Sequence, residues 1–134
     1  MEFIDTNILV YAASGAPADR RKANLARDLL RRGGFAISLQ VLQEFYVAAT
    51  HPKKLGLTPE EALAYCTQWR RLTVLEPTLE LFEEAVRIAR RFRIGYYDAA
   101  ILAAAHQLRC RTLFSEDLAA GQEYEAVRVV NPFG

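Results

Sequence analysis

Four acidic residues of this sequence stand where an ordinary surface carboxylate is not expected. Asp5 directly follows the apolar pair Phe3-Ile4, and Asp98 begins a long apolar segment. Glu44 lies in a helical pattern in which three of its four neighbours three and four places away are apolar, and Asp117 closely follows another apolar run. An unpaired carboxylate is costly to bury, so such positions call for a partner, a shifted pKa or a bound cation.

Each of these residues also has a purely structural interpretation. Asp5 and Asp98 precede or begin helical patterns and are of the residue type that caps helix N-termini. Glu44 can reach water from the edge of a helix, and Asp117 can be an ordinary loop residue. Taken singly, none of the four positions decides between structure and chemistry.

The elements that must position these residues alternate between short β-type runs and longer helical ones. Strands are expected at Glu2–Ile4, Phe35–Leu39, Thr73–Leu75, Arg111–Ser115 and Ala126–Val130, and helices at Thr6–Ala13, Pro17–Arg32, Gln40–Thr50, Thr58–Arg71, Thr78–Arg91 and Tyr97–Leu108. This alternation predicts an α/β fold with a central parallel sheet of about five strands and helices on both faces. The length and the absence of a linker or repeat predict one domain spanning residues 1–134.

In a parallel sheet, ligands collect at the carboxyl ends of the strands. Strand ends and helix starts at that edge would bring Asp5, Glu44, Asp98 and Asp117 into one crevice. A crevice with four carboxylates requires cations, and oxygen ligands of this kind suit Mg²⁺ or Mn²⁺. The chemistry that such ions serve is phosphoryl transfer with a metal-activated water.

The order of these motifs resembles the PIN-domain family, and within it the VapC-type toxins of toxin–antitoxin pairs. The resemblance covers essentially the whole chain and rests on Ile4-Asp5-Thr6-Asn7, on Glu44 after Ser38 and Gln40, on Tyr97-Asp98-Ala99, on Ser115-Glu116-Asp117 and on the closing Asn131-Pro132-Phe133. It implies a metal-dependent endoribonuclease, with RNA as the substrate, a cognate antitoxin as a partner, and a homodimer.

The resemblance also assigns roles by position. Asp5, Glu44, Asp98 and Asp117 match the acidic metal cluster of the family, and Asn7 and Ser115 match the polar residues that support it. Asp117 is preferred over Glu116 because the family pattern there is a hydroxyl residue, any residue, then an aspartate. No acidic position is lost, which argues against an inactive copy.

Two other classes of protein remain as alternatives. A non-catalytic RNA-binding PIN module would keep the fold without the chemistry. A phosphatase or phospho-acceptor domain would need a second aspartate close to Asp5 and a lysine on a late strand, but Thr6-Asn7 follows Asp5 and Arg111–Ser115 contains no lysine. His51 and His106 are both expected at helix ends, without a catalytic role.

Composition adds limits rather than a function. The 17 Lys and Arg nearly balance the 16 Asp and Glu, so net charge does not indicate a nucleic-acid partner, and the basic runs suit solvated helix faces. Cys66 and Cys110 form no disulfide framework or zinc motif. With no signal-peptide pattern and no apolar run of membrane-spanning length, we expect a cytoplasmic protein.

Overall fold

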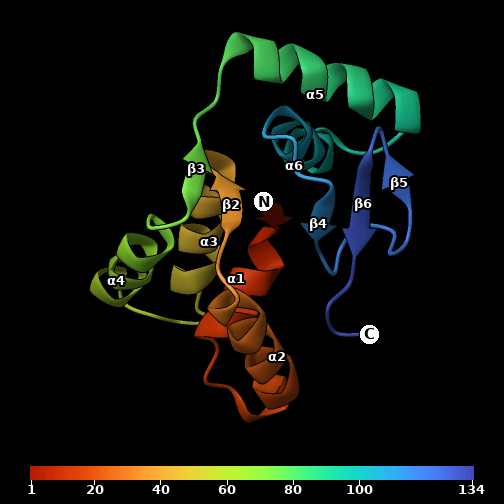
Figure 1. The fold of residues 1–134 in the computed structure, drawn as a ribbon. Helices are drawn as coiled ribbons and strands as arrows, with labels where there is room; N and C mark the ends of the chain where they lie inside the picture. Colours follow the sequence, from red (N-terminus) through yellow and green to blue (C-terminus); the bar gives the residue numbers. More distant parts are fainter.

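The computed structural model describes all 134 residues and is built on one six-stranded sheet in the order β3-β2-β1-β4-β6-β5 (Figure 1). The strands are β1 (Glu2–Ile4), β2 (Phe35–Ser38), β3 (Thr73–Leu75), β4 (Thr112–Phe114), β5 (Glu123–Tyr124) and β6 (Val127–Val130). Neighbouring strands are parallel except for β5, which runs antiparallel to β6. The carboxyl ends of the five parallel strands therefore share one edge.

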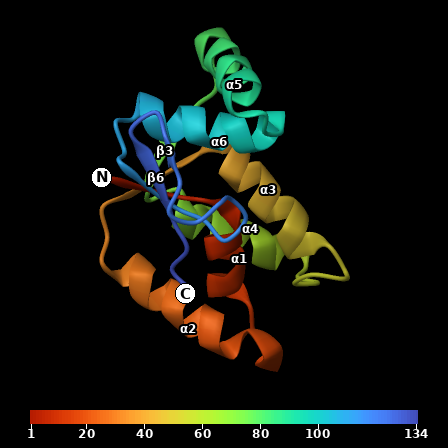
Figure 2. The same cartoon turned by 90° about the vertical axis from the view of Figure 1, so that its right-hand side faces the viewer.

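The helices flank this sheet in two groups (Figure 2). They are α1 (Thr6–Ala13), α2 (Arg20–Arg31), α3 (Leu39–Thr50), α4 (Pro59–Trp69), α5 (Leu79–Phe92) and α6 (Tyr96–Gln107), with a 3₁₀ turn η1 (Pro17–Asp19) before α2. In one group α5 packs along α6; in the other α1 packs on α2 and α3, and α3 packs on α4. The predicted α/β class with a largely parallel sheet is confirmed.

The core lies between the sheet and the two helix layers. Strand residues such as Phe3, Ile37 and Leu113 are completely buried, and so is most of the segment Ala99–Ala105 in α6. Small alanine side chains let α6 lie close to both the sheet and α5. Because α6 is covered on both of these sides, its sequence shows no polar face. None of the helices is both long and apolar enough to cross a lipid bilayer.

Several local predictions differ from the structure. The second helix does not start at Pro17, because Pro17–Asp19 forms a 3₁₀ turn before α2 begins at Arg20. The sheet has six strands rather than about five: Glu123–Tyr124 is too short to show any alternation in sequence, and pairing with β6 alone makes it a strand. Thr58, where a helix was expected to start, forms a capping box with Glu61.

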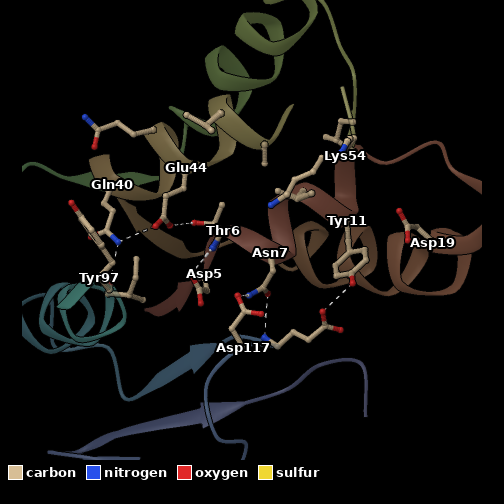
Figure 3. A pocket seen from close by; sticks show the side chains of 18 of the residues that line it. Asp5, Thr6, Asn7, Tyr11, Asp19, Gln40, Glu44, Lys54, Tyr97 and Asp117 are labelled. Carbon is tan, nitrogen blue, oxygen red and sulfur yellow. Dashed lines mark hydrogen bonds between the residues drawn. The ribbon is translucent and has the colours of Figure 1, made fainter. Parts of the chain in front are cut away.

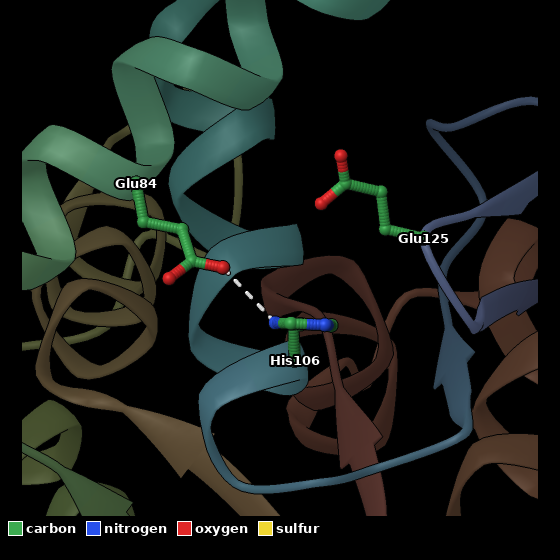
Figure 4. Close-up of side chains that lie close together, drawn as sticks. All are labelled: Glu84, His106 and Glu125. Carbon is green, nitrogen blue, oxygen red and sulfur yellow. Dashed lines mark ion pairs between the residues drawn. The ribbon is translucent and has the colours of Figure 1, made fainter.

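Side chains from the β5–β6 turn, α5 and α6 lie close together at Glu125, Glu84 and His106 (Figure 4). Ligand atoms of Glu84, His106 and Glu125 lie within 4.8 Å of one another. Arg87 donates to both carboxylate oxygens of Glu125 at 2.7 Å, and Arg91 donates to Oε2 at 2.5 Å. These two guanidinium groups lower the pKa of Glu125 to about 2. With both Glu125 oxygens already bound to arginine, the cluster is an ion-pair network that holds the turn in place.

We expect Glu125→Gln to lower the free energy of unfolding by about 1 kcal/mol at pH 7, the upper range for exposed ion pairs. The pKa of Glu125 lies below its ordinary value of 4.5, so its contribution is complete above pH 4.5 and is lost as the pH falls towards 2. Urea unfolding at pH 7 and at pH 4 measures the difference from wild type. A difference that stays constant or grows on acidification would contradict this role for Glu125.

Candidate active site

A cleft of about 980 Å³ opens at the carboxyl edge of the parallel strands (Figure 3). All four acidic residues singled out in the sequence line it, although they come from different parts of the chain. Asp5 follows β1, Glu44 lies in α3, Asp98 lies in α6, and Asp117 lies in the loop after β4. The sheet topology thus brings together residues that are separated by up to 112 positions in sequence.

Asp5 is the most deeply placed of the four, with 5% of its surface exposed. Its Oδ1 accepts a hydrogen bond from the Thr6 backbone N–H at 2.7 Å, which caps α1, and its Oδ2 accepts one from Ser115 Oγ at 2.7 Å. Burial raises the pKa of Asp5 to about 6 against the opposing effect of these two hydrogen bonds, and the negative charges of Asp117 and Glu44 raise it further. The capping interpretation of Asp5 is correct, but it does not account for this charged environment.

Glu44 is half-buried and is held by two neutral donors. Thr6 Oγ1 donates to Oε1 at 2.6 Å, and Gln40 Nε2 donates to Oε2 at 3.2 Å. Sequence reasoning missed a role for both donors. Two features of the sequence could have indicated these donors: Thr6 stands next to Asp5, and Gln40 lies one helical turn before Glu44.

Asp98 does not cap its helix, so the capping interpretation is wrong for this residue. The helix α6 begins at Tyr96, Gly95 is its N-cap, and no side chain makes the capping bond. Asp98 is the third residue of the helix, in the first turn, where the helix dipole favours a negative charge. Partial burial raises the pKa of Asp98, and the charges of Asp117 and Glu44 raise it further. Asp98 therefore belongs electrostatically to the same cluster.

The loop after β4 is held in place by the two residues predicted to support the cluster. Asn7 Nδ2 donates to Asp117 Oδ2 at 2.9 Å, and Asn7 Oδ1 accepts from the Glu116 backbone N–H at 3.1 Å. Ser115 is completely buried and accepts from the backbone N–H groups of Asp117 at 3.1 Å and Leu118 at 3.4 Å while donating to Asp5. Asn7 and Ser115 thus fix Asp117 relative to Asp5.

Glu116 lines the same cleft but differs from Asp117 in its partners. Its carboxylate forms an ion pair with Lys22 and accepts a hydrogen bond from the Tyr11 hydroxyl at 2.9 Å. Lys22 therefore already neutralises the charge of Glu116. This arrangement supports the preference for Asp117 over Glu116 as a candidate ligand.

The side chains of the cleft fit a hard divalent cation. Asp5, Glu44, Asp98 and Asp117 form no ion pair with any lysine, arginine or histidine. Burial raises the pKa values of Asp5 and Asp98, and the nearby charges of Asp117 and Glu44 raise them further, so negative charge gathers here without a counter-ion. Ligand atoms of three such side chains lie within 4.8 Å of one another only at Glu84, His106 and Glu125, so no three cleft carboxylates approach one another that closely. Mg²⁺ is usually bound by one or two carboxylates with water molecules completing its coordination shell, so its binding does not require three carboxylates in close contact.

The fold and the cleft define a class: a small α/β protein with an acidic, metal-fitting cleft at the carboxyl edge of its sheet. Comparison with known proteins gives the family, because the family model of the PIN domain matches residues 3–121. The chain belongs to the PIN-domain family. No curated protein sequence matches it.

Several solved structures share the fold. A toxin–antitoxin complex from Klebsiella pneumoniae contains a chain that is 23% identical, with a TM-score of 0.72 and 98% of each chain covered. Mycobacterium tuberculosis VapC20, a toxin that cleaves the sarcin–ricin loop, is 18% identical, with a TM-score of 0.70 over 87% of this chain and 90% of that one. Rickettsia felis VapBC2, bound to a promoter DNA fragment, is 19% identical, with a TM-score of 0.67 and 96% of each chain covered.

The burial of Asp5 gives a testable dependence of stability on pH. Its pKa is about 6 in the folded protein and 3.8 ordinarily, so the folded state binds the extra proton between these values. Stability of the metal-free protein should therefore fall as the pH rises from about 4 to 6, by roughly 2–3 kcal/mol at 1.36 kcal/mol per pKa unit. Asp5→Asn removes this dependence.

The measurement is urea unfolding in EDTA from pH 4.5 to 8. Asp28→Asn, which changes an exposed carboxylate paired only with Arg31, is the matched control and should keep the wild-type slope. Equal pH slopes for wild type and Asp5→Asn would show that Asp5 is not a strained buried carboxylate.

Proposed function

We propose that this protein is a metal-dependent endoribonuclease that cleaves RNA phosphodiester bonds with a metal-activated water. The observation that carries the proposal is the set of four carboxylates, Asp5, Glu44, Asp98 and Asp117, which line the cleft of a PIN-domain protein and form no ion pair with a cationic side chain. We extend the nuclease domain to residues 1–134, because β6 pairs with β4 beyond the matched range.

In this proposal, Asp5 and the other three carboxylates hold Mg²⁺ or Mn²⁺. Such an ion supplies two effects when bound: it makes water a nucleophile near neutral pH, and it neutralises charge on the phosphate. Thr6 and Gln40 orient the Glu44 carboxylate. Ser115 orients that of Asp5, and Asn7 orients that of Asp117. These hydrogen bonds fix the oxygen atoms before a ligand arrives, which lowers the cost of ordering the site.

The biological role that we propose is that of the toxin in a toxin–antitoxin pair. The similar fold of the Klebsiella complex and of VapC20 supports this role. Under the same proposal a cognate antitoxin closes the cleft, the toxin is a homodimer, and the protein acts in the cytoplasm. The alternative is a PIN module that binds RNA without cutting it, and the intact carboxylate set argues against it.

We expect cleavage of single-stranded or looped RNA that requires Mg²⁺ or Mn²⁺ and stops in EDTA. A metal-independent ribonuclease would be expected to use histidine as its acid and base. His51 and His106 do not line the cleft, so His51→Ala and His106→Ala should retain cleavage. Gel analysis of a labelled RNA with and without EDTA tests this expectation. Undiminished cleavage in EDTA would rule out the metal mechanism, and metal-replete wild type that only binds RNA would favour the non-catalytic alternative.

We expect Asp98→Asn to abolish cleavage while leaving the metal-free protein at least as stable as wild type. The substitution removes a like charge near Asp117 and Glu44, and it breaks no capping bond. In wild type, Mn²⁺ at a hundredfold excess over its dissociation constant should add about 2.7 kcal/mol of stability. The variant should lose most of this gain. Melting curves with and without Mn²⁺, beside a cleavage assay, measure both effects.

The matched control is Glu80→Gln, which removes a carboxylate from the first turn of α5 outside the cleft. It should keep both cleavage and the metal-induced rise in melting temperature. An Asp98→Asn variant that behaves like this control would exclude Asp98 from the site.

A further inference from the structure

The cleft extends beyond the four carboxylates and ends in two different kinds of side chain. Lys53 and Lys54 line it from the loop between α3 and α4, and Tyr97 lines it from the start of α6. In Figure 3, Tyr97 and Lys54 lie on opposite sides of Glu44, Thr6 and Asn7. None of the roles assigned so far uses these three side chains.

The two lysines are the only cationic residues that line the cleft, and neither forms an ion pair. Their loop is held by internal hydrogen bonds. The backbone N–H of Lys53 donates to His51 Nδ1 at 3.0 Å, that of Lys54 donates to the His51 carbonyl at 3.0 Å, and that of Leu57 donates to the Ala49 carbonyl at 2.8 Å. The loop therefore presents two unpaired ammonium groups from a defined position, which suits contact with phosphate groups.

Tyr97 leaves 68% of its surface exposed at the other end. Its ring packs edge-on with that of Tyr96, with centroids 5.2 Å apart, so Tyr96 covers at most one face of it. Gln40 Nε2 donates both to the Tyr97 carbonyl at 3.1 Å and to Glu44 Oε2 at 3.2 Å. The Gln40 amide thus links Glu44 to the backbone of Tyr97, whose ring keeps a free face. Free aromatic faces of this kind stack on unpaired bases.

We propose that Lys53, Lys54 and Tyr97 form a binding track for single-stranded RNA, with the lysines on backbone phosphates, Tyr97 stacked on a base, and the scissile phosphate at the carboxylates between them. The inference rests on the proposed ribonuclease function and adds the path of the substrate. It requires an unpaired strand, because base faces inside a duplex are not available to Tyr97. The track favours no particular base, since every base has a face that can stack.

The test is steady-state cleavage of a fluorescent twelve-nucleotide single-stranded RNA in Mn²⁺, together with fluorescence anisotropy of the same RNA on an Asp98→Asn background. Removing both ammonium groups with Lys53→Gln and Lys54→Gln should raise KM roughly tenfold, with a smaller change in kcat. The slope of log Kd against log salt should fall by about 1.4, because each phosphate contact on a single strand contributes about 0.7. Tyr97→Leu should weaken binding roughly tenfold, and Tyr97→Phe should retain it.

The matched control is the pair Arg70→Gln and Arg71→Gln, which removes two adjacent cations outside the cleft. It should leave KM and the salt slope unchanged. Equal effects of the lysine and arginine pairs would overturn the track, and so would a Tyr97→Phe variant as weak as Tyr97→Leu. Wild type that binds RNA through these residues without cutting it would overturn the proposed function and leave the track standing. If the lysine and tyrosine variants kept wild-type RNA kinetics but bound the antitoxin more weakly, these side chains would belong to a protein interface, and the RNA proposal would be overturned.

Discussion

The constraint on which the rest of the cleft depends is the burial of Asp5 among other carboxylates at the carboxyl edge of the sheet. Asp5 is almost completely buried beside other acids, and its pKa rises to about 6 as a result. A fold has no reason to bury such a charge for its own stability, since an apolar residue would cost less. The protein keeps the cluster and neutralises only Glu116, through Lys22. The remaining negative charge is available to a cation. The hydrogen bonds of the cleft hold the carboxylates that carry this charge in position.

The placement is achieved by neutral hydrogen-bond donors rather than by counter-ions. Ser115 connects Asp5 to the loop after β4, and Thr6 connects α1 to Glu44 on α3. Because β4 pairs in parallel with β1, the loop after β4 lies beside the start of α1. Hydroxyl and amide donors orient a carboxylate without cancelling its charge, so affinity for a cation is preserved. An arginine in place of Thr6 would hold Glu44 as firmly and remove its use as a ligand.

Sequence patterns predicted the elements well wherever a residue's role was local. The predicted start of a helix at Thr58 depends only on nearby residues, and the structure has Thr58 as the N-cap of α4. Patterns failed where pairing across the sheet decides the outcome, as for the two-residue strand Glu123–Tyr124. For the cleft, residue type and strand position predicted which acids would share an edge. They could not predict that Gly95 rather than Asp98 is the N-cap of α6, or that Lys22 pairs with Glu116. Both depend on contacts between residues that are distant in sequence.

If the four carboxylates bind a divalent cation together, the ion itself must be found among them. Anomalous diffraction from crystals of the full chain soaked in Mn²⁺ measures this position without reference to activity. We expect a manganese peak in the cleft, bonded directly or through water to Asp5, Glu44, Asp98 and Asp117. A cleft without manganese at saturating Mn²⁺, or a single peak at Glu84, His106 and Glu125 instead, would contradict it.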